Sequence, residues 1–224
     1  PHQWAKNILI LLPIMAAQQL SGLPAALLAM LCFSLAASAI YIVNDLVDLP
    51  SDRMHPRKRH RPFASGTISA QQGLVMAAGL LGLSVGLALL LPLSFLTVLM
   101  VYLAVTSAYS FWLKRKMMVD VIVLATLYTL RIVAGSMATG IALSPWLLVF
   151  SMFLFFALAT IKRQAELEDM AGRGVVTTSG RNMLPADLPI LQAMSVGAAQ
   201  GAVLVFALYS QDAEVQAHFT HPDF

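Results

Sequence analysis

Three aspartates near residue 50 have the side chains and the spacing for metal-assisted chemistry. The segment 44–52 reads NDLVDLPSD, so Asp45 and Asp48 are three residues apart and Asp48 and Asp52 are four apart. On a helix with about 3.6 residues per turn these carboxylates share one stripe, with Asn44 as a further oxygen donor beside them. Hard oxygen ligands suit Mg²⁺, which also bridges to substrate phosphates. The pattern predicts a Mg²⁺ site with Asp45, Asp48 and Asp52 as ligands.

Pro50 limits how regularly one helix can present these carboxylates. Proline has no backbone N–H, and it disfavours helical geometry in the residue before it. Asp52 can therefore reach the site from a loop instead of from the same helix. The simpler interpretation is a solvated helix end with ordinary acidic residues. The chain has only 11 acidic residues, however, and three of them gather here.

A run of basic residues follows the aspartates and includes Lys58, Arg59 and Arg61. Such a run next to an apolar segment is attracted to anionic lipid, and it orients a membrane protein. Beside a carboxylate–Mg²⁺ site the same cations would neutralise a diphosphate, because Arg makes bidentate contacts and Lys supplies a point charge. The basic segments are short and flank apolar runs without interleaved aromatic residues, so we expect no nucleic-acid partner.

The elements that position these residues are those of an integral membrane protein. Hydrophobic residues make up 58% of the 224 residues and charged residues 11%, against about 25% charged residues in soluble domains. A membrane-spanning helix needs about 20 apolar residues. The sequence therefore predicts an all-α integral membrane bundle of seven spans, the first of them short, at about 7–20, 23–43, 69–90, 93–112, 118–139, 144–161 and 185–209.

The placement of the basic residues predicts the orientation of these spans. All but one of the 14 Lys and Arg residues lie at Lys6 or within 53–61, 114–116 and 162–181. The connections at the opposite ends of the predicted spans, near 21–23, 91–93, 140–144 and 210–224, carry no Lys or Arg. The positive-inside rule places the basic segments and the neighbouring acidic motif on the cytoplasmic side of the cell's inner or plasma membrane. The single cysteine, Cys32, excludes an internal disulfide and a cysteine-based zinc site.

Two ionisable residues belong to the predicted span at 118–139. Asp120 opens it, where an acid is favourable at a helix N-terminus; the alternative is a second metal ligand or a group that orients substrate. Arg131 lies near the middle of the membrane, where an unpaired charge is costly. We expect Arg131 to face a cavity and to pair with a substrate phosphate, with Asp120 or with Glu166.

A second basic group leaves the sixth predicted span. Lys162 and Glu166 are four residues apart, so they can form a surface ion pair on a helix. The neighbouring cations Lys162 and Arg163 also suit a phosphate group at this membrane depth. We favour the phosphate site, and we assign Lys114 the same role.

With these residues, the chain resembles the UbiA superfamily of membrane prenyltransferases. The family's first motif, NDxxDxxxD, is matched in full at 44–52, and the resemblance extends to about residue 209. It implies a helical bundle with a central cavity open to lipid and a cytoplasmic cap over a Mg²⁺–diphosphate site. Family members usually have nine spans, and some carry a soluble domain upstream. We therefore expect 1–224 to be one transmembrane domain that lacks the last two spans.

The second motif departs from most of that family. The usual DxxxD after the sixth span is replaced by KRQAEL at 162–167, with Gln164 where we expect Tyr. Together with Tyr109, Asp120 and Arg131, this resembles the decaprenyl-phosphate phosphoribosyltransferase branch, whose members transfer 5-phosphoribose from phosphoribosyl pyrophosphate to a polyprenyl phosphate. The resemblance implies a catalytic group of Asp45, Asp48, Asp52 and Asp120, and substrate contacts from Asn44, Lys58, Arg59, Arg61, Tyr109, Lys114, Arg131, Lys162, Arg163 and Glu166.

Two other functions remain open from the sequence. A UbiA-type prenyltransferase would move a prenyl group from a prenyl diphosphate to an aromatic acceptor, and the absent DxxxD counts against it. A lipid or solute transporter often shows paired halves with broken helices, and the sequence shows no such pairing. The ionisable residues cluster at one predicted membrane face, which fits an active site better than a translocation path.

Overall fold

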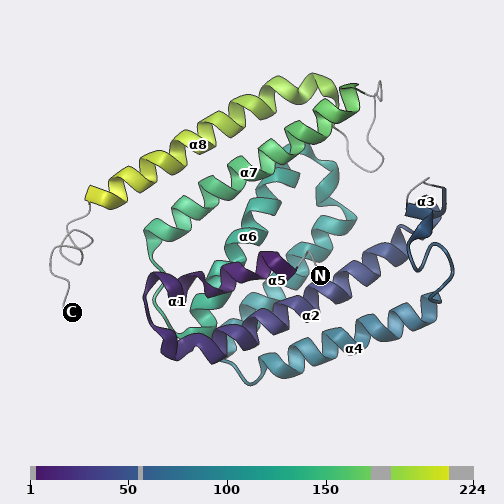
Figure 1. Cartoon of the computed structure of the whole chain (residues 1–224), viewed down its shortest axis with the longest axis horizontal. Helices are drawn as coiled ribbons and strands as arrows, with labels where there is room; N and C mark the ends of the chain where they lie inside the picture. The colour runs from purple at the N-terminus through teal and green to yellow at the C-terminus, as the bar shows by residue number, and fades with distance from the viewer. Residues whose placement is uncertain (1–3, 55–57, 173–182, 212–224) are drawn as a thin grey trace. The chain divides into compact units, whose positions relative to one another are not determined.

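The structure is a computed structural model that describes residues 4–54, 58–172 and 183–211. These residues are helical apart from turns and short connections, and no strand occurs among them (Figure 1). The predicted all-α architecture is therefore confirmed. The basic residues Arg57, Arg173 and Arg181 and the acidic residues after 211 lie outside the described residues.

Six long helices alternate with short helical turns along the chain. The long helices are α2 (Leu23–Val47), α4 (Ala70–Ala88), α5 (Leu93–Phe111), α6 (Met117–Thr139), α7 (Pro145–Gly172) and α8 (Leu188–Gln211). The short elements are η1 (Trp4–Leu11), α1 (Leu12–Ala16), η2 (Leu20–Gly22), α3 (Leu49–Met54), η3 (Lys58–His60), η4 (Leu113–Arg115) and η5 (Pro185–Asp187).

Each of the six long helices is long and apolar enough to cross a membrane, as expected for a multi-pass membrane protein. The first predicted span, at about 7–20, is the exception, because Trp4–Ala16 forms only a short apolar helical segment. That segment ends in a turn in which Gln18 adopts a φ of +53°, a left-handed conformation that stops a helix. The described chain therefore has six candidate spans and one short apolar helix, where the sequence predicted seven spans.

Contacts divide the chain into two compact units, which are described separately. The first unit comprises Pro1–Ser110 and Leu130–Ile141, and the second comprises Phe111–Thr129 and Ala142–Phe224. Helix α6 contributes its first half to the second unit and its second half to the first unit. In the first unit α2 packs along α4, and in the second α7 packs along α8 (Figure 1).

The N-terminal segment packs against α6 in the core of the first unit. Ile10 and Ile14 are almost completely buried. At Gly135 of α6 the two backbones approach so closely that a Cβ atom would overlap the carbonyl oxygen of Ile10. Phe33 of α2 packs against Tyr102 of α5, with ring centroids 4.7 Å apart.

Helices α7 and α8 are joined by apolar packing and by one half-buried amide. The ring of Phe153 lies against Gly201, where a Cβ atom would come within 2.7 Å of it. The side-chain amide of Gln164 donates to the carbonyl oxygen of Leu191 at 2.9 Å and to the hydroxyl of Ser195 at 2.8 Å. Gln164 therefore joins the two helices, at a position where the family resemblance led us to expect Tyr.

The close approach at Gly135 predicts a strong effect of one methyl group. In Gly135→Ala the new Cβ meets a backbone oxygen, which no side-chain rotation can move aside. We expect a loss of about 1–3 kcal/mol in unfolding free energy and a lower Tm of the purified protein in detergent. The matched control is Gly79→Ala on α4, where nothing lies within 4 Å of the new Cβ. Equal Tm values for both variants would contradict this packing.

Candidate active site

The first acidic motif spans a break between two helices. Helix α2 ends at Val47 and α3 begins at Leu49, so Asp48 forms the junction. Pro50 is the second residue of α3, and because it has no N–H it cannot continue the hydrogen-bond ladder of α2. The chain stays compact here, since the Asp52 N–H donates to the Asp48 carbonyl at 2.9 Å. Of the two arrangements that the sequence left open, the structure has the interrupted one, with Asp52 on a separate short helix and not on a loop.

Arg61 joins the two outer aspartates of the motif. Its Nη1 donates to Asp45 Oδ1 at 2.9 Å and to Asp52 Oδ2 at 2.8 Å. Asp52 is only 2% exposed, and the Lys58 ammonium lies 3.8 Å from its other oxygen, Oδ1. One buried carboxylate, one half-buried carboxylate and two cations therefore form a compact charged group, which we call the Asp45–Asp52 site.

The remaining predicted residues of this region are placed differently. No three Asp, Glu, His or Cys side chains converge on one point within the described ranges. The Asp48 carboxylate makes no hydrogen bond to another described residue, and Asn44 is half-buried on α2. Arg59 is exposed, and its Nε contacts the neighbouring His60 at 3.4 Å. The structure therefore brings together Asp45, Asp52, Lys58 and Arg61, and the described side chains of Asp48 and Arg59 make no hydrogen bond or ion pair with them.

The Asp45–Asp52 site has the donor chemistry that suits Mg²⁺. Asp52 Oδ1 is buried and accepts no hydrogen bond from the residues that the structure describes. The Lys58 ammonium, 3.8 Å from this oxygen, is too far away to donate a hydrogen bond to it. A buried acceptor without a donor is unfavourable, so the Asp52 carboxylate is suited to bind a further cation. Mg²⁺ usually binds one or two carboxylates and completes its shell with waters and substrate phosphates. The two carboxylates of Asp45 and Asp52 are therefore enough as protein ligands for Mg²⁺.

Arg131 belongs to a buried polar network in the first unit. Its Nε donates to Asn7 Oδ1 at 2.9 Å, and its Nη2 donates to the Tyr102 hydroxyl at 3.2 Å. The guanidinium also lies 5.1 Å from the centre of the Tyr102 ring, within the range of a cation–π interaction. Asn7 in turn donates to Ser34 at 2.9 Å. Arg131 was predicted as a site residue from the sequence and Asn7 was not, although a polar amide within an apolar run indicates a buried hydrogen-bonding partner.

The expected acidic partners of Arg131 contact a different cation. Arg163 on α7 is 2% exposed, and its guanidinium donates to both Asp120 and Glu166. Asp120 is completely buried, whereas an acid that only stabilises a helix N-terminus can remain exposed to solvent. The alternative ion pair between Lys162 and Glu166 is replaced by the pair of Arg163 and Glu166. Arg163 thus forms ion pairs with two carboxylates of the second unit, one buried and one partly exposed.

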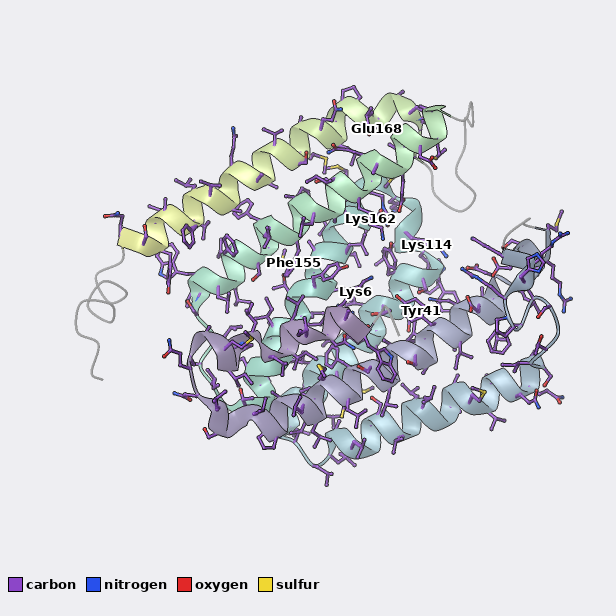
Figure 2. The ribbon with its side chains drawn as sticks, in the orientation of Figure 1. Lys6, Tyr41, Lys114, Phe155, Lys162 and Glu168 are labelled. Carbon is purple, nitrogen blue, oxygen red and sulfur yellow. The ribbon has the colours of Figure 1, made fainter. Side chains whose placement is uncertain are left out.

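Two lysines of the second unit are placed differently from Arg163. Lys162 is exposed on α7, and Lys114 is half-buried in η4 (Figure 2). Neither lysine forms a hydrogen bond or an ion pair with another described residue. Their ammonium groups are therefore available to an anion from outside the chain. Tyr109, which the sequence also assigned to the substrates, is half-buried near the end of α5 in the first unit.

Comparison with known proteins identifies the family of this chain. The profile of the UbiA prenyltransferase family matches residues 8–216. The chain belongs to this family. The expected assignment to a UbiA-superfamily transferase is thereby confirmed.

Three relatives are similar over most of the chain. They are the uncharacterized protein y4nM of Sinorhizobium fredii, 41% identical over 93% of the chain; the nodulation protein NoeC of Azorhizobium caulinodans, 35% identical over 96%; and decaprenyl-phosphate phosphoribosyltransferase of Corynebacterium glutamicum, 35% identical over 95%. The chain spans 41%, 71% and 65% of these relatives' own lengths. The predicted resemblance to the phosphoribosyltransferase branch is thus confirmed as a similarity.

A solved structure shares the fold. It is a UbiA homolog from Archaeoglobus fulgidus bound to DMAPP and Mg²⁺, with a TM-score of 0.70 and 19% identity over 86% of this chain and 69% of that chain. The predicted UbiA-type helical fold is confirmed.

The contacts of Arg163 predict different effects for two adjacent basic residues. Arg163→Gln would leave Asp120 buried beside a neutral side chain, and breaking a buried ion pair costs about 3–5 kcal/mol. We expect a marked fall in Tm in detergent. Lys162→Gln is the control, since Lys162 is exposed and should leave Tm unchanged. An unchanged Tm in Arg163→Gln would show that Arg163 does not support the folded second unit.

Proposed function

We propose that the full-length protein transfers 5-phosphoribose from phosphoribosyl pyrophosphate to a polyprenyl phosphate. The observation that carries this proposal is the charge arrangement of the second unit. Arg163 forms ion pairs with both Asp120 and Glu166, while Lys114 and Lys162 have no partner among the described side chains. This arrangement suits an anionic acceptor better than a second metal ion. The similarity to the Corynebacterium glutamicum decaprenyl-phosphate phosphoribosyltransferase supports the same donor and acceptor.

The donor diphosphate is assigned to the Asp45–Asp52 site. Asp45 and Asp52 would hold Mg²⁺, and Lys58 and Arg61 would contact diphosphate oxygens. Bound Mg²⁺ would stabilise the negative charge that develops on a departing diphosphate. The Mg²⁺ and DMAPP bound to the Archaeoglobus fulgidus homolog support a diphosphate–Mg²⁺ site in this fold.

The acceptor phosphate is assigned to Lys114 and Lys162. A phosphate monoester is already ionised near neutral pH, so the acceptor oxygen needs no strong general base. The two ammonium groups would contact the phosphate oxygens. Asp120 and Glu166 act through Arg163, which they bind, and we assign this group a positioning role.

The proposed step is a substitution at the anomeric carbon of the ribose. A lipid phosphate oxygen forms a new bond to that carbon while the bond from carbon to the diphosphate oxygen breaks. The diphosphate leaves with the bonding electron pair, so the products are a polyprenyl phosphoribose and inorganic diphosphate. We further propose that the site faces the cytoplasmic side of the cell membrane, as the distribution of basic residues predicts.

The proposed transfer predicts label in the lipid fraction. The full-length protein in nanodiscs is incubated with Mg²⁺, radiolabelled phosphoribosyl pyrophosphate and decaprenyl phosphate, and the organic phase is counted. We expect incorporation that EDTA abolishes and that Asp52→Asn lowers by about 100-fold or more, because Asp52 would hold the Mg²⁺ that stabilises charge on the departing diphosphate.

The matched control for this assay is Glu168→Gln, which removes an exposed acid further along α7 (Figure 2). Incorporation should equal that of the wild type. If no label enters lipid but a prenyl diphosphate is consumed with an aromatic acceptor, the prenyltransferase alternative is correct. Movement of lipid or solute across the membrane without release of diphosphate would instead indicate a transporter.

The assignment of Lys162 predicts a selective loss of acceptor affinity. In Lys162→Gln the KM for decaprenyl phosphate should rise about tenfold, as expected for one lost charge-assisted contact. The KM for phosphoribosyl pyrophosphate should stay the same. The control is Lys116→Gln, an exposed lysine in the same basic connection as Lys114. Equal acceptor KM values in both variants would remove Lys162 from the acceptor site.

A further inference from the structure

One guanidinium nitrogen occupies the point where the two proposed metal ligands meet. Arg61 Nη1 lies 2.9 Å from Asp45 Oδ1 and 2.8 Å from Asp52 Oδ2. A divalent cation shared through these two oxygens would need the space that Arg61 Nη1 fills, and the two positive charges would repel each other there. Arg61 and a metal ion therefore cannot both occupy this position.

We propose that Arg61 is an exchangeable internal cation of the donor site. It neutralises Asp45 and Asp52 when the site holds no metal, and it turns to the diphosphate when the metal takes its place. This inference rests on the proposed function, since it assigns the metal and the diphosphate to the Asp45–Asp52 site.

The resting contact has a clear electrostatic reason. Asp52 is 2% exposed, and a buried carboxylate beside a second carboxylate is unfavourable without a counter-charge. Arg61 supplies that charge to both groups through a single nitrogen. The two carboxylates are therefore held together and partly neutralised before any metal arrives.

The backbone around Arg61 is held, while its side chain has room to move. The Arg61 N–H donates to the Lys58 carbonyl at 2.9 Å, and the Arg61 carbonyl accepts from the Ser65 N–H at 2.8 Å. Phe63 is buried against Gly73 of α4 and anchors the loop. The side chain of Arg61, by contrast, is 41% exposed. The exchange thus requires a change of side-chain rotamer and no rearrangement of the loop.

The exchange links metal binding to diphosphate binding. A metal ion that binds alone must displace Arg61 and leave it without its anionic partners. A metal ion that arrives with diphosphate gives Arg61 a new anion, so the displacement is compensated. The wild-type protein should therefore bind a divalent cation much more tightly when diphosphate is present, and part of this cooperativity should depend on Arg61.

The test measures metal binding without turnover. Mn²⁺ is titrated into the full-length protein in detergent and followed by electron paramagnetic resonance, with and without inorganic diphosphate. We expect Arg61→Gln to bind Mn²⁺ alone about tenfold more tightly than the wild type, because a competing charged contact is removed. We also expect diphosphate to increase Mn²⁺ affinity less in this variant. The control Arg53→Gln removes an exposed cation of the same region and should behave as the wild type.

Equal or weaker Mn²⁺ binding by folded Arg61→Gln would overturn the exchange. Arg61→Lys keeps a cation and should give intermediate affinity; it serves as the second variant if Arg61→Gln has a lowered Tm. Failure of every variant to bind Mn²⁺ would overturn both the exchange and the assigned donor site. Normal cooperativity without phosphoribosyl transfer would leave the exchange standing and refute only the proposed substrates.

Discussion

An apolar helical bundle can contain charged side chains only where each charge meets a compensating partner. Burial removes the water that would otherwise solvate an ion, and the cost is large unless contacts inside the protein replace it. In this chain Asp52 is paired with Arg61, and Asp120 is paired with Arg163. Arg131 is surrounded by the amide of Asn7 and by Tyr102. These contacts determine which side chains remain available to substrates.

The two compact units compensate their charges in different ways. In the first unit one guanidinium bridges two carboxylates through a partly exposed side chain, so the contact can exchange. In the second unit Arg163 is almost completely buried with Asp120, so that contact is structural. Arginine–carboxylate pairs thus form an exchangeable contact in one unit and a fixed contact in the other. The difference lies in the solvent exposure of the arginine side chain.

Local sequence patterns predicted most of the fold. Apolar runs of sufficient length identified the six long helices, and Pro50 indicated the break in the acidic motif. The short N-terminal segment was misassigned as a span because its composition is apolar, while its length is limited by the turn at Gln18. An apolar composition indicates that a segment is buried in lipid or in protein, but it does not indicate where the backbone turns.

Partners that are distant in the sequence could not be predicted in the same way. Arg163 and Asp120 are 43 residues apart, and Arg131 and Asn7 are 124 apart. Helical periodicity relates residues three or four positions apart and carries no information on such pairs. The sequence therefore identified the ionisable residues but not their partners: it offered Asp120 or Glu166, beside a substrate phosphate, as the anion for Arg131, whereas both acids contact Arg163. Asn7 was missed because a single amide has no spacing pattern.

The packing of Phe63 on Gly73 has a consequence for how this region can diverge. An added Cβ at position 73 would come within 2.6 Å of the Phe63 ring, which anchors the loop carrying Arg61. A larger residue would force the Phe63 ring to move, although position 73 touches no ion or substrate. Position 73 thus favours the smallest side chain, and a substitution there would reach the Arg61 loop only through Phe63.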